Sequence, residues 1–166
     1  MKQKLLLGLA ITLAVAVPAF SNQALETHFI NSKGQAIGTA TLTDTHDGIL
    51  IHTNLSKLPM GWHGFHIHSV GECKAPDFKS AGSHFNPEQK EHGFENLNGT
   101  HMGDMPNVHV GKDGLLETDI LLKGMTLAML EDKDGSALVL HAGQDDYKSN
   151  PAGNSGDRIA CGVIGK

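Results

Sequence analysis

Eleven histidines stand in this chain of 166 residues, which contains only two cysteines. Imidazole nitrogens bind transition metals and exchange protons near neutral pH. His66 and His68 are two residues apart in an alternating apolar–histidine run, so on a strand both rings would point to the same face. Two imidazoles side by side on a rigid element form half of a metal site. The His-x-His pattern alone is weak evidence for a metal, and it more often reflects two ordinary residues on a polar face.

A second group of potential ligands lies in the segment 69–107, and its members are His84, His92, His101 and Asp104. Three histidines and one aspartate form a plausible tetrahedral zinc set with no open position. His141 ends a further apolar run, where it can face His66 and His68. A set of imidazoles without thiolate or thioether ligands suits copper, zinc, iron or nickel.

Short runs of alternating or branched residues predict the strands that would position these side chains. The runs are 39–43, 49–53, 65–68, 137–141 and 159–164, and turn signals lie at 31–34, 46–48, 112–114 and 132–135. Several short strands at roughly ten-residue spacing predict an all-β chain, folded as an antiparallel sandwich or barrel. Segment 117–130 is compatible with either a strand or a helix, and Gly124 argues against one long helix.

Two long loops interrupt this pattern. Segment 69–107 has 39 residues, little alternation and prolines at positions 76, 87 and 106. A structureless loop of this length is unusual inside a compact domain. We therefore expect a disulfide at one end and a metal in the middle to order it. Segment 142–157 is a second loop, rich in Gly, Asp and Asn, and it ends at Arg158.

The first 21 residues are typical of a secretory signal peptide cleaved after Ser21, with Lys2 and Lys4 preceding an apolar run at 5–17. That run is shorter than the roughly 20 residues of a membrane-spanning helix. The predicted mature domain, 22–166, has 11 basic and 18 acidic residues, a net charge of -7, which disfavours nucleic-acid binding through a basic surface. Export to an oxidising compartment favours a Cys73–Cys161 disulfide over two free thiols.

Five motifs together carry a resemblance to a known family. They are GFHIH at 64–68, GSHFNP at 82–87, HG at 92–93, HMGD at 101–104 and GNSGDRIACGVI at 153–164. The chain resembles the copper/zinc superoxide dismutases from about 61 to 164. The signal peptide and Cys73, five residues after His68, are similar to the bacterial periplasmic branch. The resemblance implies a Greek-key β-sandwich or barrel with two functional loops. It also implies a periplasmic enzyme that converts superoxide to oxygen and hydrogen peroxide by cycling copper between Cu(II) and Cu(I).

The resemblance also assigns roles to individual residues. The implied copper ligands are His66, His68, His84 and His141, and the implied zinc ligands are His84, His92, His101 and Asp104. His84 would bridge both metals and donate a proton. Asp145 would bond His66 and His92, Arg158 would draw in the superoxide anion, and Cys73 and Cys161 would form the disulfide. His63 takes a structural role, and no ligand position matches His28, His46, His52 or His109.

Two other functions fit parts of the sequence. An exported copper-binding or buffering protein on the same sandwich would need the ligands, but neither Arg158 nor Asp145. A zinc hydrolase would need an open position on the zinc ion. The four donors of the second group leave no such position. We expect no nucleic-acid partner and no membrane association after signal cleavage. The sequence leaves open whether the protein is a monomer or a homodimer, and whether Lys79, Lys90 or Lys148 helps to attract the substrate.

Overall fold

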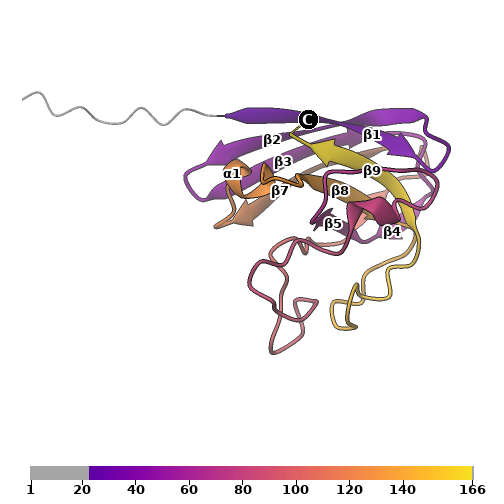
Figure 1. Cartoon of the computed structure of the whole chain (residues 1–166). Helices are drawn as coiled ribbons and strands as arrows, with labels where there is room; N and C mark the ends of the chain where they lie inside the picture. Colours follow the sequence, from indigo (N-terminus) through magenta and orange to yellow (C-terminus); the bar gives the residue numbers. More distant parts are fainter. Residues whose placement is uncertain (1–22, 166) are drawn as a thin grey trace, which may run out of the picture.

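The protein is described here by a computed structural model that covers residues 23–165, most of them in or between antiparallel strands (Figure 1). The predicted signal peptide, 1–21, lies outside the described residues. The strands are β1 (Ala24–Asn31), β2 (Ala36–Thr45), β3 (Gly48–Leu55), β4 (Gly61–His63), β5 (Phe65–His68), β6 (Val108–Val110), β7 (Leu116–Lys123), β8 (Ser136–His141) and β9 (Arg158–Ile164). The helices are the 3₁₀ turn η1 (Lys79–Ala81) and the short α1 (Leu127–Leu130).

The strands form one large curled sheet in the order β5-β8-β9-β1-β2-β3-β7, with a second ladder between β4 and β6. All the ladders are antiparallel. β4 runs directly into the edge strand β5, and β6 turns into the opposite edge strand β7. The β4–β6 ladder therefore links the two edges and closes the sheet into a barrel. The predicted all-β antiparallel fold is confirmed, and long crossover connections give it its Greek-key character.

The five runs predicted as strands all lie within strands, whereas β1, β4 and β6 were not predicted. The ambiguous segment 117–130 contains both elements. β7 ends at Lys123, Gly124 turns the chain with a positive φ of 75°, and α1 follows as a single helical turn. Only glycine adopts this backbone conformation without strain, so Gly124 separates the strand from the helix.

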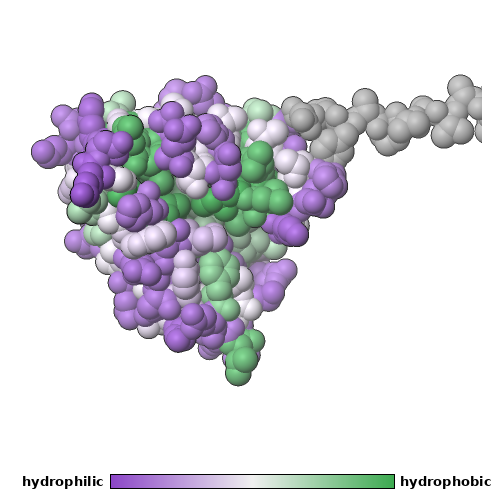
Figure 2. All heavy atoms as spheres, turned by 180° about the vertical axis from the view of Figure 1, so that it is seen from behind, coloured by the Kyte–Doolittle hydropathy of each residue, from purple (hydrophilic) through white to green (hydrophobic). Residues whose placement is uncertain are grey.

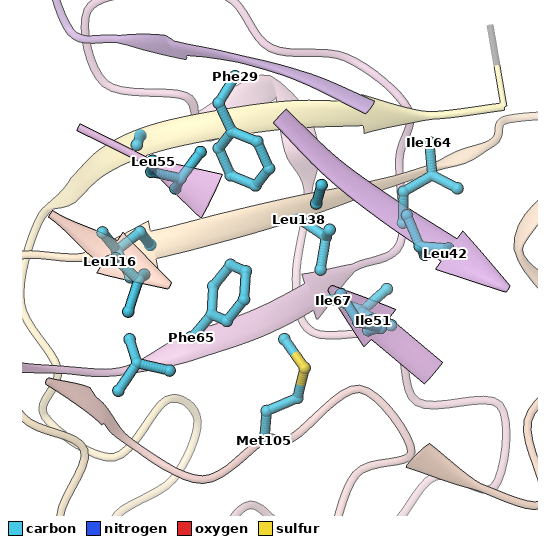
Figure 3. Close-up of a cluster of buried hydrophobic side chains, with 14 of the residues drawn as sticks. Phe29, Leu42, Ile51, Leu55, Phe65, Ile67, Met105, Leu116, Leu138 and Ile164 are labelled. Carbon is cyan, nitrogen blue, oxygen red and sulfur yellow. The ribbon is translucent and has the colours of Figure 1, made fainter. Parts of the chain in front are cut away.

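Strand β5 contributes to the core with one face and presents His66 and His68 on the other. Its Phe65 and Ile67 point into the barrel, where they pack with Phe29, Leu138 and Met105 (Figure 3). The period-two alternation turns the intervening histidines to the opposite face, as predicted. Those histidines are nevertheless fully buried, because the long loop covers them.

Backbone pairing ties segment 69–107 to the free edge of β5. Ile67 N donates to Gly103 O at 2.9 Å, and its carbonyl accepts from Phe85 N at 2.8 Å. Isolated bridges also join His66 to Asp104 and His68 to His84. The loop thus satisfies the unpaired groups of an edge strand while it carries ligand-type side chains to the face of that strand. This anchoring was not foreseen from the sequence.

The disulfide between Cys73 and Cys161 is confirmed, with a Cα–Cα distance of 5.7 Å, and it fixes the start of the loop to β9. It borders a second, smaller apolar cluster of Phe78, Ala81, Ala137, Val139 and Cys161. Seen from behind, the surface has an apolar band across the sheet, whereas the loops below it are mostly hydrophilic (Figure 2). Among residues 23–165, no helix has the length and apolar character to cross a membrane.

Candidate metal centre

Four histidines from three separate parts of the chain converge on the outer face of β5. His66 and His68 come from β5, His141 ends the neighbouring β8, and His84 comes from the loop. One ring nitrogen from each lies within 4.8 Å of the others. The ring of His66 is 4.1 Å from that of His84 and 4.9 Å from that of His141, centroid to centroid. We call these residues the four-histidine set.

Hydrogen bonds orient each ring of this set. His68 Nδ1 lies 3.0 Å from Gly82 O, and His141 Nδ1 lies 3.2 Å from Gly156 O. Because a carbonyl oxygen only accepts, these Nδ1 atoms must carry the proton. His66 donates instead through Nε2, to Asp145 Oδ2 at 2.7 Å. Each of these rings therefore presents its other nitrogen as an unprotonated acceptor.

One ring nitrogen of each histidine in the set has no hydrogen-bond partner among the residues that the structure describes. These nitrogens are His66 Nδ1, His68 Nε2, His84 Nε2 and His141 Nε2. A buried polar atom without a partner is costly, and four such atoms converge within one small volume. Four imidazole lone pairs pointing at one another are the donor set that a transition metal requires. The residues present therefore fit a metal ion of the copper type.

Burial keeps these rings neutral. It lowers the pKa of His66 from 6.5 to about 4 and the pKa of His141 to about 3. The pKa of His68 also lies well below 6.5, because of burial and the nearby charges of His84 and Arg158. Metal ligands must be unprotonated, so at neutral pH these three histidines are ready to bind.

The second donor set lies wholly in the loop and consists of His84, His92, His101 and Asp104. Asp104 Oδ1 lies 2.8 Å from His84 Nδ1, 3.1 Å from His92 Nδ1 and 3.2 Å from His101 Nδ1. The Nδ1 atoms of His101 and His84 are 3.4 Å apart. A tetrahedron with zinc–ligand bonds of about 2.0–2.1 Å has edges of about 3.3 Å. We call these residues the loop set, and their spacing fits one tetrahedral zinc ion.

The second oxygen of Asp104 is saturated by the loop itself. Asp104 Oδ2 accepts from Gly93 N and His101 N, both at 3.0 Å, and from Thr100 Oγ1 at 2.7 Å. These three bonds fix the carboxylate and leave Oδ1 facing the rings. Burial alone would raise the pKa of Asp104, but its hydrogen bonds to His84, His92 and Thr100 outweigh that effect and lower it. The aspartate is therefore ionised.

Asp145 connects the two sets, with the contacts that the family resemblance implied. Its Oδ2 accepts from His66 at 2.7 Å and its Oδ1 accepts from His92 Nε2 at 3.0 Å. Burial raises the pKa of Asp145, but the hydrogen bonds to His66 and His92 are stronger and lower it. Burial lowers the pKa of His92, whereas its bonds to Asp104 and Asp145 raise it to about 9. Such a carboxylate fixes the orientation of both rings.

Sequence reasoning missed the residues that hold Asp145. Asn107 Nδ2 donates to Asp145 O at 2.9 Å, and Asn107 Oδ1 accepts from Asp145 N at 2.8 Å. The hydroxyl of Tyr147, the single tyrosine of the chain, accepts from Asn107 N at 2.7 Å. Asn150 Oδ1 accepts from His92 N at 2.7 Å and joins the two loops directly. These partners are 38 to 58 positions apart, so no local pattern reveals them.

Arg158 lines a groove of about 470 Å³, together with Asp77, Lys79 and Asp157. Its Nη1 donates to Phe78 O and its Nη2 to Gly82 O, both at 2.7 Å. Gly82 O also accepts from His68 Nδ1, so one carbonyl separates the guanidinium from the four-histidine set. The structure thus brings Arg158 to the set, as expected from the sequence.

Of the three lysines considered, Lys79 shares this groove and pairs with Asp77 at 3.3 Å. Lys90 pairs with Glu88 and Lys148 with Glu95, each at 2.6 Å. Because neither of these two lines the groove of Arg158, only Lys79 is placed beside the guanidinium.

The remaining histidines lie outside both sets, as the sequence predicted. His63 is buried between the carbonyls of His141 and Pro59, at 2.7 and 2.9 Å. His52 contacts Asp119 across β3 and β7 at 2.7 Å, and His109 packs edge-on against Trp62. His46 contacts Asp47 at 3.3 Å, and His28 is exposed on β1.

Comparisons with known proteins agree with this geometry. The sequence model of the copper/zinc superoxide dismutase family matches residues 36–164. The chain is 49% identical over 150 residues to superoxide dismutase (Cu-Zn) 1 of Aquifex aeolicus, covering 86% of this chain and 89% of that one.

Two solved structures share the fold. A SOD-like protein from Bacillus subtilis has 41% identity and a TM-score of 0.80, covering 84% of this chain and 97% of that one. The Cu/Zn superoxide dismutase from Brucella abortus has 29% identity and a TM-score of 0.73, covering 86% of this chain and 100% of that one. The chain therefore belongs to the copper/zinc superoxide dismutase family.

Proposed function

We propose that this protein is an exported superoxide dismutase that converts superoxide to oxygen and hydrogen peroxide. The observation that carries the proposal is the convergence of four buried imidazole nitrogens that have no partner within residues 23–165, one carbonyl away from a half-buried arginine. Family membership supports the same function.

The proposed copper ligands are the four-histidine set, and the proposed zinc ligands are the loop set. His84 belongs to both, because its Nε2 faces the first set while its Nδ1 lies among the donors of the second. Copper at this position supplies the one-electron exchange that oxidises one superoxide and reduces the next. Zinc has no redox chemistry, and four donors leave its position closed. Its proposed role is to order the loop and to hold His84.

Arg158 binds the incoming anion in this proposal. Although the predicted mature domain carries a net negative charge, the local field in a groove guides a small ion more than the net charge does. The guanidinium is held by two carbonyls and remains charged at neutral pH. Asp157 and Asp77 line the same groove, and they reduce the positive field at its rim.

His84 supplies a proton in this proposal. Reducing superoxide to hydrogen peroxide consumes two protons, and one of them needs a donor close to the reacting oxygen. His84 Nε2 has no protein partner within the described residues, so it can hold a proton and pass it on. The Nδ1 side keeps the ring in place through its neighbours in the loop set.

Two alternatives are less well supported. A copper-buffering protein would not need an arginine fixed beside the histidines. In this protein, both terminal nitrogens of Arg158 donate hydrogen bonds that fix the side chain there. A zinc hydrolase would need an open zinc position, and the loop set has four donors within one tetrahedral volume.

Export to the periplasm is also part of the proposal. It is supported by the N-terminal pattern, by the disulfide and by bacterial relatives. Sequencing the N-terminus of the protein recovered from a periplasmic extract tests it. A first residue of Asn22 is expected, and an uncleaved Met1 would contradict export through this signal.

The test of the activity is metal content and superoxide consumption on one purified sample. We expect about one copper and one zinc per chain, with rapid turnover. Arg158→Ala should lower the second-order rate by about tenfold or more, since electrostatic guidance accelerates association by that factor, while copper stays bound. Copper bound to the wild type without turnover would contradict the enzyme and favour buffering. Loss of copper from Arg158→Ala would assign Arg158 a structural role.

A further inference from the structure

The side chain of Arg158, the single arginine of the chain, is held by a turn in segment 69–107. Its two terminal nitrogens donate to Phe78 O and Gly82 O, which flank the 3₁₀ turn η1. Both carbonyls lie 76 or more positions away in the sequence. The direction of the guanidinium therefore depends on where this turn lies.

Phe78 holds an uncommon backbone conformation in that turn. Its φ of 52° and ψ of 22° are left-handed, which is rare for a bulky side chain and persists only where the surroundings impose it. The residue is fully buried, and its N donates to Lys74 O at 3.0 Å. Its carbonyl accepts from Ala81 N at 3.1 Å as well as from Arg158. This conformation points the carbonyl at the guanidinium.

The Phe78 ring packs the turn against the barrel, together with the small side chain of Ala81. It packs in the smaller apolar cluster with Ala137 and Val139 of β8 and Cys161 of β9. Phe78 is also the only buried residue between Gly71 and Ala81. The salt bridges nearby, Lys79–Asp77 among them, are exposed and contribute little. The Cys73–Cys161 disulfide fixes the start of this segment, and the Phe78 ring is the large apolar side chain that packs the part next to η1 against the barrel.

We propose that Phe78 is a positioning residue for the anion site: burial of its ring fixes the turn whose carbonyls hold Arg158 in its groove. Because His68 also donates to Gly82 O, the same turn sets the guanidinium relative to the four-histidine set. The importance of this placement for catalysis rests on the proposed function, whereas the placement itself does not.

The first experiment uses the metal-free protein and NMR of the guanidinium. A single arginine gives one set of Nε–H and Nη–H signals, so they belong to Arg158 without ambiguity. Two bonds at 2.7 Å should slow rotation of the guanidinium and keep the Nη–H signals separate. Phe78→Gly keeps the left-handed backbone without strain and removes the ring, so these signals should merge. Phe78→Leu, which still fills the cluster, should keep them separate.

Phe29→Ala is the matched control. Phe29 is equally buried, but it packs in the main core and makes no bond to Arg158. It should lower stability and leave the Arg158 signals unchanged. If Phe78→Gly does not fold, Phe78→Ala, which puts no branched side chain at this left-handed position, is judged by the same criterion. Separate Nη–H signals in a folded Phe78→Gly or Phe78→Ala protein would overturn the proposal.

The second experiment measures binding of azide, a small monovalent anion, to the copper-loaded protein by visible absorption. Phe78→Gly should weaken azide binding about threefold or more, as expected when a fixed charge loses its position, with copper content unchanged. Unchanged azide affinity would overturn the functional part of the inference. A wild type that neither binds azide nor consumes superoxide would contradict the proposed dismutase activity, and the metal-free NMR result would still decide the role of Phe78.

Discussion

The two donor sets share His84, yet different kinds of structure hold them. In the four-histidine set, His66, His68 and His141 come from neighbouring strands, and their spacing follows from the β5–β8 register. In the loop set, every ligand comes from segment 69–107. One set is therefore placed by a ladder of backbone hydrogen bonds, and the other by a loop that must itself be held in position.

The two sets also differ in charge. The four-histidine set contains no carboxylate, and burial lowers the pKa of His66, His68 and His141. The loop set contains the ionised Asp104, and the pKa of His92 is raised to about 9. Without metal, His66, His68 and His141 remain neutral at pH 7, whereas protonated His92 and Asp104 form an ion pair in the second set.

The largest expected effect of this difference is on the pH dependence of the metal-free protein. His66 and His141 take up protons near pH 6.5 when unfolded, but only near pH 4 and 3 when folded. Their contribution to stability is thus present above pH 6.5 and is lost as the pH falls toward 4, by several kcal/mol. The raised pKa of His92 acts oppositely: its contribution is complete below pH 6.5 and is lost as the pH rises through 9.

Urea unfolding of the metal-free protein between pH 4.5 and 9 measures this prediction. The free energy of unfolding should be greatest near pH 6.5 and fall on both sides. A free energy of unfolding that keeps rising from pH 6.5 to 9 would show that Asp104 and Asp145 do not stabilise the protonated form of His92. Adding metal should flatten the alkaline side, because a metal ion takes the place of the His92 proton, and should leave the acid side steep, because metal-bound ligands must stay unprotonated.

Asp104→Asn should separate the sets most clearly among the substitutions. It removes the charge and weakens the donor that lies 2.8 to 3.2 Å from three ring nitrogens. Zinc affinity should fall about a hundredfold or more, beyond the range for a residue that only supports a ligand, while copper affinity changes little. Chelator competition followed by metal analysis gives both values. Equal loss of copper and zinc would mean that the two sets do not bind independently.

Asp145→Asn should have a smaller effect on both sets at once. Asp145 contacts His66 in one set and His92 in the other, so we expect each metal affinity to fall about 10- to 100-fold. The control is Asp146→Asn, which removes the same charge from the neighbouring residue. Asp146 bonds Lys148 N and Ser149 N and contacts neither histidine. An Asp146→Asn protein with the same metal loss would attribute the effect to the loop and not to Asp145.

The sequence predicted much of this fold, and the exceptions have physical causes. Strands with strict alternation, such as 65–68, were found, whereas β1 was missed because buried Thr27 places a polar residue on its inner face. β4 and β6 have three residues each, too few to show a period. Through the family resemblance, the dense motifs assigned the candidate metal-binding residues one by one. Asn107 and Phe78 were not predicted, since their partners, Asp145 and Arg158, lie far along the chain.

The amino-acid sequence by itself determined which side chains could bind metal and that His66 and His68 share one face, because residue type and strand period are local properties. The tertiary structure decided which nitrogen of each ring is free and where Arg158 points. His66 presents Nδ1 because Asp145, 79 positions away, accepts from Nε2. Arg158 faces its groove because two carbonyl oxygens of a distant turn accept hydrogen bonds from its guanidinium. Such choices depend on contacts between segments that only folding brings together.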